Sequence, residues 1–303
     1  MTLKDSVVNF FENFPPNDFN RTNFNLNGSK FNLLRHWKLF DLILVAILAG
    51  TYQLTYSIQP FQRSFSITDL NISHPFTEHE TVTNHQLFLY SYWIPLCLIL
   101  TGALILSRLN LKIYTTWISL LGLNLSMFVT LNVTNILKNF IGNLRPDFLS
   151  RCIPKPGTPE NVLVLAKDVC TSDNLDRLLD GFRSTPSGHS SLAFAGLFYL
   201  TLWLMGQLVA LDVDVGVWRS IICFIPSLGA ALIAVSRLED YRHHYFDVMF
   251  GSAIGILVST FCYFKLFPSL NDKKSFNPRS INEQDLEVKA SDSQGYSLVE
   301  QQV

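Results

Sequence analysis

The chain has 303 residues, a formal net charge of −1, 48% hydrophobic residues and only 16% charged residues. Soluble domains usually carry about 25% charged residues, and the charges that are missing here are missing in blocks. The near-neutral balance gives no indication of nucleic-acid binding, which usually requires a basic excess. The composition therefore favours a membrane protein over a soluble one.

Six long apolar runs predict six helices that cross a bilayer. Each is close to the roughly 20 residues that span a hydrocarbon core, and only Asp41 and Lys265 fall inside them, both near an end. A soluble bundle of buried helices is the less favoured alternative, and no N-terminal signal peptide is expected. We predict an all-α, six-span transmembrane bundle with runs near 40–58, 87–106, 113–137, 190–211, 220–236 and 248–267.

The polar segments outside these runs predict the topology. Residues 1–38 are interpreted as a cytosolic N-terminal segment, 39–267 as the membrane domain, and 268–303 as a disordered cytosolic tail without apolar periodicity. Basic residues concentrate before the first span and after the last, which places both termini in the cytosol by the positive-inside rule. The loops after the first, third and fifth spans then lie on the far side of the membrane.

Two features fit a non-cytosolic far side. The sequence NIS at Asn71 is a glycosylation acceptor in a predicted far-side loop, although NGS at Asn27 and NVT at Asn132 also match the pattern and are placed in the cytosol and in a span. Cys152 and Cys170 fall in the loop between the third and fourth spans. They would pair in an oxidising compartment, and two free thiols remain the alternative.

Three charged clusters lie at span ends that the parity of the spans places on one membrane face. They read KNFIGNLRPD (Lys138–Asp147), FRSTPSGHSS (Phe182–Ser191) and SRLEDYRHHYFDV (Ser236–Val248). Each alone has an ordinary explanation: cations that reach the headgroups, Ser187 as a helix N-cap, or interfacial histidines. Together they supply the groups that phosphoryl transfer requires.

A phosphoryl group in transfer needs positive charge around its oxygens. Lys138, Arg145 and Arg237 are the candidates, because arginine donates in forked pairs that match phosphate and lysine adds a point charge. The sequence PSGH adds backbone donors at a helix start, and Gly188 has no side chain to block the approach of an anion. The expected active site therefore lies at the non-cytosolic membrane interface.

The histidines supply the candidate nucleophile and acid. His243 and Asp247 are four residues apart and are expected to share a helix face, so Asp247 would orient His243 for attack on phosphorus. His244 has no carboxylate at that spacing, and His189 remains as the general acid. A metal site is less favoured, because magnesium on phosphate prefers carboxylates and three fixed cations would repel it. No metal and no cofactor are expected.

The three clusters fit K-x6-R-P, P-S-G-H and S-R-x5-H-x3-D, and the chain resembles the type-2 phosphatidic acid phosphatase superfamily. RPDFLSRC, LLDGFRSTPSGHSS and DYRHHYFDV resemble the fungal diacylglycerol pyrophosphate phosphatases. The resemblance implies a six-helix bundle and magnesium-independent hydrolysis of diacylglycerol pyrophosphate, phosphatidate and often lysophosphatidate in a vacuolar membrane. It also implies the same roles for the residues above, with Ser187 and Gly188 holding phosphate beside Lys138, Arg145 and Arg237.

Several alternatives stay open. A lipid phosphotransferase would use the same phosphohistidine, and a lipid-binding membrane protein would need no chemistry. Gly251 and Gly255 form a GxxxG pattern that suits either packing within the bundle or a homo-oligomer. The long loop 147–185 is a candidate lid or headgroup selector. Asn124, Asn132 and Asn135 lie in the third span and are expected to face other helices.

Overall fold

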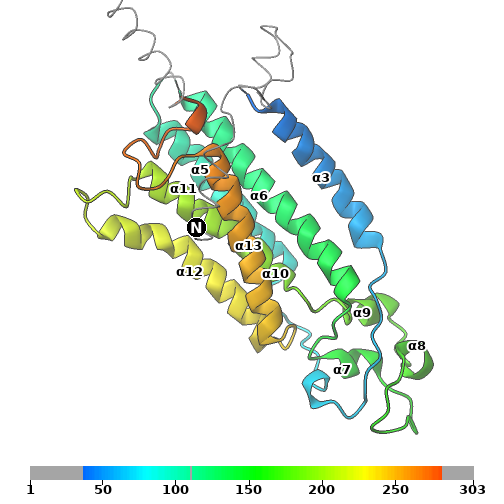
Figure 1. Ribbon diagram of the computed structural model, residues 1–303. Helices are drawn as coiled ribbons and strands as arrows, with labels where there is room; N and C mark the ends of the chain where they lie inside the picture. Colours follow the sequence, from blue (N-terminus) through cyan, green and yellow to red (C-terminus); the bar gives the residue numbers. More distant parts are fainter. Residues whose placement is uncertain (1–36, 110, 282–303) are drawn as a thin grey trace, which may run out of the picture. The chain divides into compact units, whose positions relative to one another are not determined.

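The computed structural model describes residues 37–109 and 111–281 (Figure 1). Most of the predicted N-terminal segment and the end of the predicted tail therefore lie outside the described residues. The chain divides into two units, Met1–Leu39 and Phe40–Val303, and the site and all but the first residue of the spans belong to the second.

The described residues form helices and loops, with two isolated antiparallel bridges and no strand. In chain order the elements are α3 (Leu39–Ser57), η1 (Leu70–Ile72), α4 (Asn84–Phe88), η2 (Leu89–Trp93), α5 (Ile94–Leu106), α6 (Lys112–Ile141), α7 (Phe148–Cys152), α8 (Ala166–Val169), α9 (Leu175–Asp180), α10 (Gly188–Ala193), η3 (Phe194–Phe198), α11 (Tyr199–Gln207), α12 (Trp218–Glu239) and α13 (Tyr245–Leu266).

Among the described residues, six continuous helical runs are long and apolar enough to cross a bilayer. Two of them are built from three consecutive elements, with the π-helical segments η2 and η3 in the middle. The predicted all-α bundle with six spans is confirmed. The runs are Leu39–Ser57, Asn84–Leu106, Lys112–Ile141, Gly188–Gln207, Trp218–Glu239 and Tyr245–Leu266.

The helix α6 packs against α5, α10 and α13 (Figure 1). Asn132 donates to the carbonyl of Leu48 at 2.8 Å, and Asn139 donates to the carbonyl of Thr55 at 2.7 Å, which ties α3 to α6. Asn135 reaches the Thr55 hydroxyl at 3.1 Å, and Asn124 accepts from Tyr92 at 3.0 Å. Asn124, Asn132 and Asn135 each contact another span, as predicted, and Asn135 also lines the cavity described below.

Glycines permit the end of α6 and the close approach of α13 to α10. Gly142 ends α6 in the left-handed conformation, with φ of 60°, where a side chain would also collide with the backbone of Phe61. In α13, a Cβ at Gly251 would collide with the carbonyl of Ser187, and one at Gly255 with that of Ser191. The GxxxG pattern therefore brings α13 against α10 within this chain.

The loop between α6 and α10 has a defined structure. It carries α7, α8 and α9, and the sulfurs of Cys152 and Cys170 form a disulfide across it. An apolar cluster under the loop joins it to the loop after α3 through Phe65, Ile72, Phe148, Cys152, Ala166, Val169 and Phe182. This packing gives the loop a fixed place beside the ends of the spans.

Residues 268–281 differ from the predicted disordered tail. Ser275 is fully buried and donates to the carbonyl of Gly206 at 2.9 Å, and Ile281 is also buried. Gln207 donates to the carbonyl of Phe276 at 2.9 Å. Isolated polar contacts of this kind do not produce a periodic pattern of apolar residues, so the sequence contains no sign that this segment is ordered. Residues 282–303 lie outside the described part of the chain.

Candidate active site

The three sequence clusters meet at one end of the bundle, because α6 and α12 end there while α10 and α13 begin there (Figure 1). Lys138, in the last turn of α6, donates to the carbonyl of Arg183 at 2.6 Å. The amide of Ser187 donates to the carbonyl of Asp247 at 2.9 Å. These contacts join segments that lie tens of residues apart in the chain.

A cavity of about 880 Å³ opens between these helix ends. Six of the eight residues predicted for catalysis and phosphate binding line it: Lys138, Arg145, Gly188, His189, Arg237 and His243. Its other walls include apolar and aromatic side chains of the spans, among them Tyr52 and Tyr56 of α3, Leu87 and Phe88 of α4, and Leu131 of α6. Charged and apolar side chains therefore line one cavity.

Ser187 and Asp247 do not line the cavity. Ser187 is fully buried, and its hydroxyl caps α10 by accepting from the amide of Ser190. Its own amide is already bonded to Asp247. The structure thus places Ser187 at the N-cap of α10, and its predicted contact with phosphate stays a prediction.

The four-residue spacing predicted that His243 and Asp247 lie on one helix, and the structure differs. The helix α13 begins at Tyr245, so His243 precedes it and its Nδ1 lies 3.9 Å from Asp247 Oδ2. That distance exceeds an ordinary hydrogen bond, although such contacts are often longer before substrate binds. Burial, together with the charges of Arg145 and Lys138, holds the pKa of His243 well below its usual value, so the ring is neutral at neutral pH.

His244 makes the closer contact with Asp247. It is the N-cap of α13, its amide donates to Asp247 Oδ2 at 2.9 Å, and its Nδ1 lies 3.2 Å from the same oxygen. The hydrogen bond to Asp247 raises the pKa of His244. The four-residue rule missed this contact because capping pairs residues three apart. The cavity still distinguishes the two rings, since His243 lines it and His244 does not.

Two hydroxyls that the sequence reasoning missed complete the surroundings of Asp247. Ser184 donates to its Oδ2 at 2.6 Å, and Thr185 makes a short hydrogen bond to its Oδ1. Both residues belong to the cluster FRSTPSGHSS, so their presence near the site was visible, but their partner was not. The two hydroxyls and the amide of His244 all donate to this buried carboxylate and fix its orientation.

Arg145 is held by a carboxylate that the sequence reasoning also missed. Asp180, at the end of α9, accepts from Arg145 Nη2 at 2.8 Å and from Arg151 Nη1 at 2.9 Å. Burial alone would raise the pKa of Asp180, but the two guanidinium groups outweigh it and hold the pKa below its usual value. Arg151 also binds the fully buried Asp147 through two bonds of 2.8 and 2.9 Å. The loop 147–185 therefore fixes one cation of the cavity.

Within the part of the chain that the structure describes, no group of three or more His, Cys, Asp or Glu side chains is placed to hold a metal ion. The cavity brings together the cations Lys138, Arg145, Arg183 and Arg237, two histidines and the carboxylates of Glu80, Asp176 and Asp180, and Asp247 lies behind His243. This set can hold an anion of the size of phosphate and place a neutral imidazole beside it.

Comparison with known proteins places this arrangement in a family. Residues 119–269 match the PAP2 superfamily. Diacylglycerol pyrophosphate phosphatase 1 of Saccharomyces cerevisiae is 49% identical over 249 residues, which cover 82% of this chain and 86% of that protein. The chain belongs to the PAP2 superfamily. This confirms the family that the three sequence clusters indicated.

Other PAP2-type relatives extend over similar lengths. The probable diacylglycerol pyrophosphate phosphatase 1 of Schizosaccharomyces pombe is 38% identical over 239 residues, covering 78% of this chain and 84% of that protein. Lipid phosphate phosphatase 1 of Arabidopsis thaliana is 32% identical over 247 residues, covering 80% and 71%. No solved structure matches this chain. The PAP2 match contains every predicted catalytic and phosphate-binding residue and begins after α3, α4 and the loop between them.

Proposed function

We propose that this chain is a magnesium-independent lipid phosphatase that hydrolyses diacylglycerol pyrophosphate and phosphatidate, and also lysophosphatidate, through a phosphohistidine. The observation that carries the proposal is that Lys138, His189, Arg237 and His243 line one cavity although they come from three separate segments. The names of the relatives in Saccharomyces and Arabidopsis support a lipid phosphate as the substrate.

In the first step, Nε2 of His243 attacks the terminal phosphorus. Its Nδ1 faces Asp247, which stabilises the positive charge that develops on the ring. The bond from phosphorus to the leaving oxygen breaks as the new nitrogen–phosphorus bond forms, and His189 gives a proton to the departing oxygen. Lys138, Arg145 and Arg237 stabilise the charge on the three equatorial oxygens during transfer.

In the second step, water attacks the phosphohistidine. His189, now neutral, takes a proton from this water, the nitrogen–phosphorus bond breaks, and inorganic phosphate leaves. His243 and His189 thereby return to their starting states. The two steps need no electron transfer and no co-reactant other than water.

The walls of the cavity suit a lipid whose phosphate lies at the membrane surface. Aromatic and apolar side chains of α3 and α4 line the same cavity as the cations. The phosphate of a lipid would reach the cations while the acyl chains remain in the hydrocarbon. The loop 147–185 adds Leu175, Asp176 and Leu179 to the wall, which supports its proposed role in covering the site or selecting the headgroup.

The proposed location is a membrane whose far side is non-cytosolic, with the site facing that side, and the kinship with fungal enzymes favours the vacuole. Asn71 is exposed, and its loop contacts the site, because the Asn71 carbonyl lies 3.2 Å from His244 Nε2. The disulfide is in the loop that carries Asp180. An oxidising compartment suits the disulfide, and a non-cytosolic side suits a glycan on Asn71.

A substrate panel on the purified protein in detergent with EDTA tests the proposal. We expect phosphate release from diacylglycerol pyrophosphate and phosphatidate without divalent metal, inhibition by orthovanadate, and a loss of at least about 10³-fold in His243→Ala. His85→Ala is the matched control, since His85 is exposed and does not line the cavity. A requirement for added magnesium, or full activity of His243→Ala, would contradict the proposal.

A further inference from the structure

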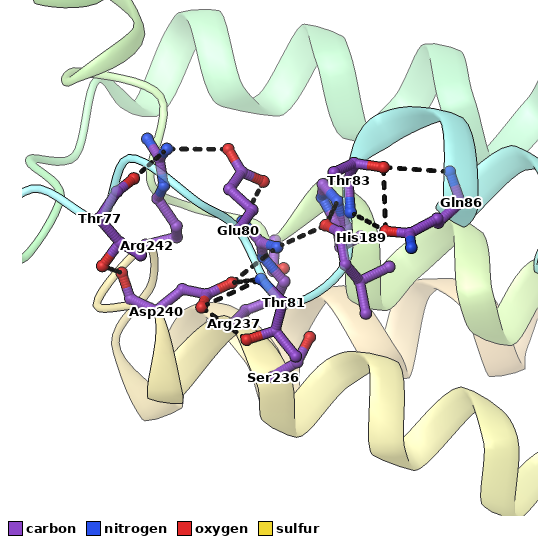
Figure 2. A network of polar contacts seen from close by, with 12 residues as sticks. Thr77, Glu80, Thr81, Thr83, Gln86, His189, Ser236, Arg237, Asp240 and Arg242 are labelled. Atoms are coloured by element: carbon purple, nitrogen blue, oxygen red, sulfur yellow. Dashed lines mark hydrogen bonds and ion pairs between the residues drawn. The ribbon is translucent and has the colours of Figure 1, made fainter.

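The segment Thr77–Thr83, between α3 and α4, contacts the site although it belongs to none of the three clusters. It also lies outside the residues that match the PAP2 superfamily. Figure 2 shows this segment beside the ends of α12 and α10, with Glu80 between Arg237 and Arg242. Its contacts with two proposed site residues call for a functional explanation.

Glu80 bridges two arginines. Its Oε2 accepts from Arg237 Nη2 at 2.9 Å, and its Oε1 accepts from Arg242 Nη2 at 2.8 Å. The side chain of Arg237 is only 2% exposed, whereas that of Glu80 is 26% exposed and lines the cavity. A guanidinium that is buried to this extent is stabilised by carboxylate partners, and Glu80 supplies one from the cavity side in addition to Asp240.

The same segment also holds His189. The carbonyl of Val82 lies 3.1 Å from His189 Nε2 and accepts from Arg237 Nη1 at 2.9 Å. Because a carbonyl oxygen only accepts, Nε2 of His189 carries a hydrogen in this contact. The Val82 carbonyl thus contacts both His189, the proposed acid, and Arg237, a proposed phosphate-binding cation.

The segment is itself anchored on both sides. Thr81 donates to the carboxylate of Asp240 from its amide at 3.0 Å and from its hydroxyl at 2.8 Å. Thr83 and Gln86 form a capping box that starts α4 directly after Val82. Asp240 in turn lies 3.3 Å from Arg237 Nη1. These contacts restrict the positions that Glu80 and Val82 can adopt.

We propose that Glu80 is a positioning residue, which sets the orientation of Arg237 toward the phosphate of a lipid substrate. The proposal rests on the function proposed above. An arginine side chain has many rotamers, and its planar fork binds phosphate well only in one orientation. Glu80 and the Val82 carbonyl occupy donors on both terminal nitrogens of the guanidinium, which leaves little rotational freedom. Glu80 acts through Arg237 and does not take part in bond breaking.

The test compares Glu80→Ala and Glu80→Gln with wild type, measuring kcat and KM for diacylglycerol pyrophosphate and the inhibition constant of orthovanadate. Loss of a charge-assisted hydrogen bond predicts a rise of about 10-fold in KM and in the vanadate constant for Glu80→Ala, with kcat within about twofold. Glu80→Gln should restore part of the loss, because its amide oxygen still accepts from Arg237. Glu78→Gln, whose carboxylate is 71% exposed and 3.5 Å from Arg177, is the control and should match wild type.

A merely structural role would lower the melting temperature and kcat through a smaller active fraction, with KM and the vanadate constant unchanged, and would overturn the proposal. A fall in both constants would also overturn it, because Glu80 would then compete with phosphate for Arg237. If Glu80→Ala does not fold, the partial effect of Glu80→Gln on both constants decides.

Arg237→Ala separates the positioning role of Glu80 from the proposed phosphate site. If Arg237→Ala raises both constants and Glu80→Ala does not, only the positioning role fails. Wild-type constants in Arg237→Ala would defeat the proposed site as well.

Discussion

His243 and His244 are adjacent in the sequence, but they have different environments. His243 is buried beside Lys138 and Arg145, lines the cavity and has a pKa well below its usual value. His244 caps α13 and bonds to Asp247, which raises its pKa. A neutral ring with a free nitrogen suits a nucleophile, and a ring that is readily protonated beside a carboxylate suits a structural pair.

The role of His189 as an acid predicts a dependence on the leaving group. Phosphatidate would release an alkoxide, which needs a proton, whereas diacylglycerol pyrophosphate would release a phosphate oxygen that is far less basic. We expect His189→Ala to lower kcat/KM for phosphatidate by about 10²- to 10⁴-fold and for diacylglycerol pyrophosphate by clearly less. Because kcat/KM reports the steps up to release of the first product, the later water step does not obscure the comparison. Equal losses on both substrates would rule out this role.

The contact between His244 and Asp247 predicts a pH-dependent stability. A pKa raised on folding gives stability that is fully present below the unfolded value of about 6.5 and is lost as the pH rises through the folded value. Wild type should therefore melt higher than His244→Gln at pH 6, and the difference should shrink toward pH 8. His243, whose folded pKa lies well below its usual value, is present in both proteins, so its own contribution cancels in this comparison. A difference that is constant or grows with pH would contradict the pairing.

Residues in the three clusters could be predicted from the sequence, and their partners could not. Lys138, His189 and Arg237 stand at fixed places in recognisable patterns, and the parity of the spans brings them together. Glu80 and Asp180 carry no such pattern, because each pairs with an arginine far away in the chain or on another element. Such contacts depend on how the loops pack against the helix ends, and hydrophobic periodicity does not predict that packing.

At the scale of helices, the close approach of α13 and α10 positions the first turn of each. A Cβ at Gly251 would collide with the backbone of Ser187, which cannot move without displacing the start of α10. We expect Gly251→Ala to lower stability by about 1–3 kcal/mol and to reduce activity with both lipids. Gly229→Ala is the control, since its Cβ would meet Leu197 at an ordinary 3.8 Å. Thermal unfolding in detergent measures the effect, and equal melting temperatures for the two variants would contradict it.

Helix existence was easier to predict than helix ends. Length and lack of charge identified all six spans. The start of α13 was not identified, because the expected run began at Val248 and the helix begins at Tyr245, after a cap by His244. Caps depend on the geometry of one or two residues, so a small error in the helix start changed which histidine was expected to meet Asp247.

At the scale of the whole molecule, the side of the membrane that the site faces can be read from two glycosylation acceptors. Asn71 is in the loop beside the site, and Asn27, outside the described residues, is on the segment predicted to be cytosolic. We expect a eukaryotic host to glycosylate Asn71, so that Asn71→Gln abolishes the shift on glycosidase treatment and Asn27→Gln does not. A glycan on Asn27 instead would place the site in the cytosol.

The most direct test of the account is to trap the phosphorylated enzyme. Diacylglycerol pyrophosphate labelled in its terminal phosphate is mixed with protein in EDTA and quenched in alkali within one turnover. We predict a protein-bound label that is stable in alkali and lost in acid, that builds up in His189→Ala because the water step loses its base, and that is absent from His243→Ala. Label that persists in His243→Ala, or no label in His189→Ala while the lipid is still cleaved, would contradict the account.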